Sequence, residues 1–218
     1  MNGFDFLEDY ILRIPVEHSQ KALQLLVVCD KWDLQGARDT ITKELALKNL
    51  DKKCYPNAIM WALRHGNSAL ISAIVTETME NVDTKELLMV GNCLKCSGNL
   101  YFTCPELVFL RSYYEFLLYV SENKWESASD KLSVLLSNNS VPAFLYTPIL
   151  DAMINCITYQ DLDIASVAVG VSQAIEKLRS AITRSAIRVS NKKEILKKLS
   201  HLDYLLSDGL IFKDLMNA

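Results

Sequence analysis

Residues that interrupt helices are scarce in this sequence. Its 218 residues include only 7 glycines and 5 prolines, so tight turns must be few. No segment alternates apolar and polar residues with a period of two beyond a few positions. An all-β architecture needs a turn about every 8–12 residues, so both absences argue against one. Long helices joined by short connections are the expected alternative.

The sequence also lacks a strong net charge and a long apolar run. A net charge of −3 gives no electrostatic reason to expect direct binding to nucleic acid. The longest apolar stretch, residues 107–120, contains Arg111 and Glu115, so we expect no insertion into a membrane. The N-terminus is acidic where a secretory signal is basic, and it has no small-residue cleavage site. A cytosolic or nuclear protein is therefore expected.

No arrangement of side chains typical of catalysis is present. His18, His65 and His201 are far apart, and none of them neighbours a Ser or Cys in a nucleophile motif. No glycine-rich loop could bind phosphate. Neighbouring carboxylates such as Glu8 and Asp9 suit helix starts or solvated faces. We therefore predict no catalytic residue, no cofactor and no enzyme activity.

The cysteines form one arrangement that resembles a ligand cluster. Cys93 and Cys96 have the spacing CxxC, and Cys104 follows. Zinc needs a fourth ligand, and no His or Cys follows Cys104 closely. A redox dithiol would need a strand–helix–strand setting, which the pattern does not show. We interpret these residues as buried or half-buried thiols and predict no metal site; a metal or redox protein is the alternative.

Apolar residues recur at helical spacing along nearly the whole chain, which predicts an all-α fold of roughly ten to twelve helices. The helices differ in length and share no repeat signature, so we expect an irregular stack of antiparallel helices, an α-solenoid-like block. We divide this continuous stack into residues 1–80 and 81–218. The patterned segments include 4–12, 19–30, 34–50, 56–64, 87–96, 105–122, 124–137, 161 or 163 to about 179, 191–200 and 202–216.

Several helix ends can be predicted from local chemistry. Gly66 suits the residue after a helix end, and Asn67 suits the cap of the next helix. Asp83 and Glu86 have the spacing of a capping box. Thr147 and Pro148 fit a cap followed by the first helical position, although a kink is nearly as good an interpretation.

Two candidate surfaces for a partner lie near the C-terminus. The last helical segment has apolar residues on more than one side, and a terminal helix buries only one face in its own domain. Packing in the core is an equally good interpretation of this candidate interface, which comprises Leu202, Leu205, Leu206, Leu210, Ile211, Phe212, Leu215 and Met216. The second candidate is a basic face for an acidic partner, with a solvated helix face as the simpler explanation. It comprises Lys177, Arg179, Arg184, Arg188, Lys192, Lys193, Lys197 and Lys198.

Four collinear stretches resemble one known family, the eighty-five-kilodalton nucleoporins of the Y-shaped scaffold complex of the nuclear pore. Residues 107–157 show the family's order of a Leu/Tyr-rich helix, an Ala/Ser/Leu helix, a Ser/Asn-and-Pro break and a long apolar helix. Residues 13–26 resemble its Ile-Pro break before a Gln-Lys-Ala-Leu helix. Residues 58–64 and 69–79 resemble the two helices of the family that follow. Beyond about residue 180 no alignment is made.

The resemblance implies a position and a function. Nothing in the chain resembles the family's β-rich insertion blade, so we expect a C-terminal piece: residues 1–80 as the end of the trunk and 81–218 as the tail of the ancestral coatomer element. The tail would dock an arm of the Y to other long helical nucleoporins at its hub. The small propeller partner is not expected to bind. The implied location is the nuclear pore complex in the nuclear envelope. The resemblance is also compatible with a location at kinetochores in mitosis.

Through the integrity of the pore, such a module would support messenger RNA export and protein import indirectly. The alternative within the same class is a helical scaffold subunit of a vesicle coat or of an assembly like the proteasome lid. Coat proteins share the fold-back helical element, so the fold by itself does not separate them.

Overall fold

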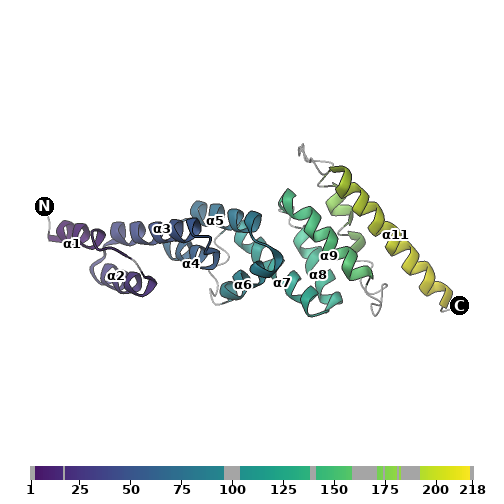
Figure 1. The fold of residues 1–218 in the computed structure, drawn as a ribbon, viewed down its shortest axis with the longest axis horizontal. Helices are drawn as coiled ribbons and strands as arrows, with labels where there is room; N and C mark the ends of the chain where they lie inside the picture. The colour runs from purple at the N-terminus through teal and green to yellow at the C-terminus, as the bar shows by residue number, and fades with distance from the viewer. Residues whose placement is uncertain are drawn as a thin grey trace. The chain divides into compact units, whose positions relative to one another are not determined.

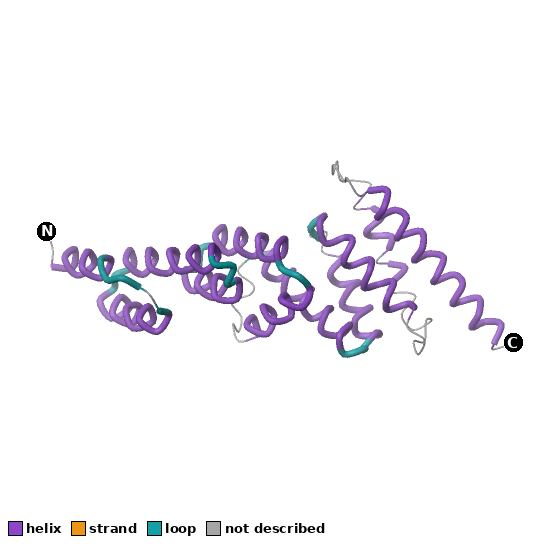
Figure 2. The backbone as a smooth tube through the Cα atoms, viewed as in Figure 1, coloured by secondary structure: helices purple, strands orange, loops and turns teal. Residues whose placement is uncertain are grey.

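The computed structural model describes residues 3–16, 18–95, 104–137, 141–158, 171–173, 175–180, 182 and 192–216. Every regular element in these ranges is a helix, which confirms the predicted all-α class (Figure 2). The elements are α1 (Gly3–Leu12), α2 (Ser19–Trp32), α3 (Gln35–Asp51), α4 (Tyr55–His65), α5 (Ser68–Asn81), α6 (Thr84–Lys95), α7 (Pro105–Ser121), α8 (Trp125–Ser137), the 3-10 helix η2 (Ala143–Leu145), α9 (Tyr146–Thr158) and α11 (Lys192–Met216). No helix within these ranges combines the length and the apolar character that crossing a bilayer requires.

The chain forms two compact units. The first consists of Met1–Val82 with Asn92–Leu107, and the second of Asp83–Gly91 with Val108–Ala218. Both α6 and α7 contribute residues to both units. The predicted assignment of 1–80 to a trunk end and 81–218 to a tail remains a prediction.

In the first unit, α3 is the central helix. It packs along α4 and also contacts α1 and α2, while α4 pairs with α5 (Figure 1). Small side chains line these contacts: Ala37 and Ala46 on α3, and Ala58 and Ala62 on α4, are all fully buried. An alanine at a helix–helix contact lets the two backbones approach closely, and the larger Ile41 and Ile59 fill the space beside them.

In the second unit, the core comes from apolar stripes on successive helices. On α7, Tyr113 stacks on Phe109 and Phe116 with ring centroids 6.0 and 6.2 Å apart. On α9, which packs against α11, Ile149 and Leu150 are fully buried. The helical residues around 171–182 add a further buried stripe, namely Val171, Ile175, Leu178 and Ile182.

Local chemistry fixes the helix ends that the sequence predicted. Gly66 ends α4 in the left-handed region with φ +78°, as a glycine after a helix end should. The Asn67 side chain accepts a hydrogen bond of 3.0 Å from the backbone N–H of Leu70. The Asp83 carboxylate accepts one of 2.8 Å from the N–H of Glu86. These three predictions are confirmed.

Two predictions about helix boundaries are wrong. The predicted helices 191–200 and 202–216 are one continuous helix, α11 (Lys192–Met216). Ser200 does not break it because its hydroxyl donates to the carbonyl oxygen of Leu196 at 3.0 Å, and no Gly or Pro lies between residues 192 and 208. Thr147 is not the cap of α9, which starts at Tyr146. Pro148 then lies in the first turn, where its missing N–H leaves no helical bond unmade.

Gly91 marks a close approach within the second unit. It lies inside α6, where glycine disfavours a helix by about 0.5–1 kcal/mol relative to alanine. A Cβ atom at this position would overlap the ring of Tyr114 on α7, which is fully buried. The glycine therefore allows α6 and the aromatic core of α7 to meet.

We expect Gly91→Ala to lower the free energy of unfolding by about 1–3 kcal/mol, because overpacking outweighs the gain in helix propensity. Urea unfolding followed by circular dichroism measures this difference. Gly36→Ala on α3 is the matched control, since its Cβ would meet only the flexible carboxylate end of Glu8. The loss should shrink in a Tyr114→Leu background. Equal stability of Gly91→Ala and the parent protein would contradict the close approach.

Candidate partner interface

The inner face of α11 accounts for part of the predicted interface. Ile195, Leu199, Leu202 and Leu206 follow one stripe of the helix and are all buried in the second unit. Leu202 and Leu206 therefore belong to the core, which was the equally good interpretation of the pattern. Leu205 is half-buried at the edge of this stripe. Five further predicted residues, Leu210, Ile211, Phe212, Leu215 and Met216, lie on α11, but the structure does not describe their side chains.

The outer face of α11 carries two apolar side chains that the sequence analysis missed. Tyr204 is 62% exposed and Leu196 is 40% exposed. Both fall outside the buried stripe at helical spacing, which is the signal that could have identified them. Exposed apolar side chains that gather in a patch mark partner surfaces, which makes these two side chains candidates for one.

The predicted basic face divides into two groups. Lys198 pairs with Asp151 of α9 at 2.6 Å and with Glu194 at 3.6 Å. Arg179 pairs with Asp203 of α11, and with Glu176 at 3.6 Å. These two cations hold α11 against α9 and against the helical residues 175–180, so they are part of the fold.

The other basic residues differ in their surroundings. Lys192, Lys193 and Lys197 are exposed on the first two turns of α11, and no ion pair joins them to the described residues. Lys177 is half-buried and has partners of its own. Arg184 and Arg188 lie outside the described residues. The structure therefore leaves the three α11 lysines facing solvent.

The cysteine arrangement is described only in part. Cys104 is buried, and burial raises the pKa of its thiol, which keeps it protonated and weakly nucleophilic. Burial likewise raises the pKa of Cys29 on α2. Cys96 lies outside the described residues, as does the side chain of Cys93. Among the residues that the structure describes, no three His, Cys, Asp or Glu side chains gather as metal ligands.

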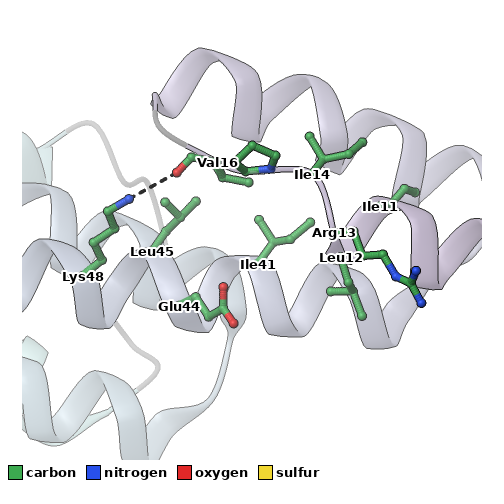
Figure 3. Close-up of a pocket in the computed structure, with 10 residues that line it drawn as sticks. Ile11, Leu12, Arg13, Ile14, Val16, Ile41, Glu44, Leu45 and Lys48 are labelled. Carbon is green, nitrogen blue, oxygen red and sulfur yellow. Dashed lines mark hydrogen bonds between the residues drawn. The ribbon is translucent and has the colours of Figure 1, made fainter.

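A pocket of about 330 Å³ lies between α3 and the chain that leaves α1 (Figure 3). Its deepest side chains, Ile11, Ile41 and Leu45, are buried and apolar. The ammonium group of Lys48 donates to the carbonyl oxygen of Val16 at 3.3 Å and closes one side. The remaining lining residues are Leu12, Arg13, Ile14, Pro15 and Glu44. This lining can hold an apolar group but has no nucleophile with a neighbouring base.

Charged side chains join α7 to α8 in the second unit. The two oxygens of Glu115 pair with Arg111 of α7, at 3.3 Å, and with Lys131 of α8. Burial by itself would raise the pKa of Glu115, but the hydrogen bonds and charges of Lys131 and Arg111 outweigh it and lower the pKa. The carboxylate is thus held in its charged form as a link between two helices.

A family sequence model described as Nup85 nucleoporin matches residues 1–180 of the chain. The nuclear pore complex protein Nup85 of Xenopus laevis is 26% identical over 208 residues, which cover 92% of this chain and 30% of the relative. Nup75 of Drosophila melanogaster is 25% identical over 144 residues, covering 66% and 22%. Nup85 of Homo sapiens is 25% identical over 148 residues, covering 67% and 23%. The chain spans less than a third of each relative's length.

We expect Glu115→Gln to destabilise the protein at neutral pH by about 0.5–1 kcal/mol, because Lys131 loses its partner on α7. A carboxylate whose pKa is lowered by folding stabilises the folded protein at pH values above its unfolded pKa of about 4.3. This stabilisation disappears as the pH falls through the pKa of the folded state. Urea unfolding from pH 7 to pH 3 should therefore show the variant and the parent converging. Glu122→Gln is the control, since Glu122 pairs only with the nearby Lys124 among described residues. A difference that persists at pH 3 would contradict the link.

Proposed function

The chain belongs to the Nup85 nucleoporin family, and on that premise we propose that it is a structural, non-enzymatic module of the nuclear pore scaffold. The match of the family model to residues 1–180 carries the proposal. The relatives are named as nuclear pore complex proteins, so the proposed location is the pore in the nuclear envelope. Support for messenger RNA export and protein import would be indirect, through the integrity of the pore.

Within that scaffold, we assign the chain to the end of the trunk and the tail of a Y-complex arm. The tail would dock the arm to the hub by packing its helices against other long helical nucleoporins. The second unit supports this assignment, because its described elements are helices with a dense apolar core and its helix α11 leaves side chains exposed. A stable interface of about 1,600 Å² in total would suffice, with a few large side chains dominating the binding.

The 218-residue chain should form a stoichiometric complex with C-terminal fragments of the two other long helical nucleoporins of the hub. Size-exclusion chromatography with light scattering measures the mass of the chain by itself and in each mixture. The expected result is a species whose mass equals the sum of the components.

The small propeller partner is the negative control, because we expect no binding to this part of the family's chain. A folded monomer that binds neither hub fragment would overturn the hub-docking proposal. Binding to the propeller partner would reassign the chain to another part of the arm.

A further inference from the structure

The outer face of α11 combines positive charge with exposed apolar surface. A helix has about 3.6 residues per turn, so Lys193, Lys197 and Tyr204 lie on the side opposite the buried stripe from Ile195 to Leu206. Leu196 lies on the flank of this side. All four side chains are exposed. We call these four residues the outer α11 face.

The fold supplies carboxylates to Lys198 of α11 and to Arg179 on the neighbouring helical residues 175–180, whereas the described part of the chain supplies none to the lysines of the outer face. Lys198 and Arg179 are paired with Asp151 and Asp203. Within the described part of the chain, no carboxylate lies within ion-pair distance of Lys193 or Lys197. These two ammonium groups are one helical turn apart, and Leu196 lies next to Lys197. Their charge is thus available to an external group.

The outer α11 face has the length of a helix-packing site. From Lys193 to Tyr204 it extends about 16 Å along the helix, which is three turns. Carboxylates on a second helix, four residues apart, match the separation of the two lysines. Apolar side chains of the same helix would then cover Leu196 and the ring of Tyr204. Removing these two side chains from water would contribute binding affinity. The charge pairs would fix how the partner helix is aligned along α11.

The charge pattern also disfavours some ligands. Asp208 is exposed one turn beyond Tyr204. Asp203 borders the face but is paired with Arg179. A polyanion of uniform charge, such as a nucleic acid or an anionic membrane, would meet the carboxylate of Asp208 along with the lysines. A protein helix can place its acidic residues opposite Lys193 and Lys197 only. The sign pattern therefore favours a protein partner.

We propose that the outer α11 face binds an acidic amphipathic helix of a partner protein, through Lys193 and Lys197 to its carboxylates and through Leu196 and Tyr204 to its apolar side. This deepens the proposed docking function and rests on it for the identity of the partner. The binding chemistry itself depends only on the four residues named.

The test reverses the two charges in Lys193→Glu with Lys197→Glu. Lys21→Glu with Lys43→Glu is the matched control, since both of its lysines are exposed on the first unit and the net charge changes equally. The first probe is the pair of hub fragments, and the second is a designed helical peptide with Glu four residues apart and Leu on the same side. Calorimetry should show Kd at least about tenfold weaker for the reversed variant and unchanged for the control. Tyr204→Ala should also weaken binding, and unchanged circular dichroism confirms the fold of each variant.

Compensation is the sharper criterion. A peptide with Lys in place of Glu should bind the reversed variant better than it binds the parent protein. Hub fragments that bind parent and reversed variant equally would overturn this inference and leave the proposed function standing. If the parent protein binds the acidic peptide but not the hub fragments, and the charge reversal weakens that binding, the inference is upheld and the hub assignment is overturned. Lysine-dependent binding to single-stranded RNA or to phosphatidylserine vesicles, tighter than to the peptide, would overturn the protein partner.

Discussion

The structure depends on one constraint: each helix must bury an apolar stripe against its neighbours. The described residues contain no strand, so no ladder of hydrogen bonds joins one element to the next. Interdigitating side chains must therefore hold the helices together. The smallest side chains at a contact determine how closely the two helix axes can approach. On α3, the fully buried Ala37 and Ala46 lie nine residues apart and so on opposite sides of the helix, where each lets a neighbouring helix approach closely. Gly91 does the same for α6 against the ring of Tyr114.

This constraint explains why the sequence predicts the elements better than their arrangement. Helical periodicity and caps are local, so Gly66, Asn67 and Asp83 could be assigned from neighbours in the sequence. The predicted break after residue 200 was wrong because Ser200 completes its hydrogen bond inside the helix, to the carbonyl oxygen of Leu196. The role of Gly91 could not be predicted at all. It depends on Tyr114, which lies 23 positions away in sequence and meets it only in the folded unit.

The candidate site on α11 also could not be located from local sequence patterns. Apolar residues on several sides of α11 fitted core packing and a partner surface equally well, and did not show which side would be buried. The structure buries Leu202 and Leu206 and exposes Tyr204 between them. The choice is made by α9, which packs on one side of α11. Charge was equally ambiguous: the run of basic residues gave no reason to separate Lys198, which Asp151 holds, from Lys197 beside it.

The paired and the solvated cations near α11 have different roles. Lys198 and Arg179 stabilise the position of α11 within its unit, whereas Lys193 and Lys197 contribute little to the fold because their charges remain solvated. Binding energy can thus be changed on one side of the helix without loosening the other. A docking module of the proposed kind needs this independence, because its partners must recognise a surface that already has its final shape. The buried stripe keeps α11 in place, so the outer α11 face, the proposed partner surface, keeps its shape.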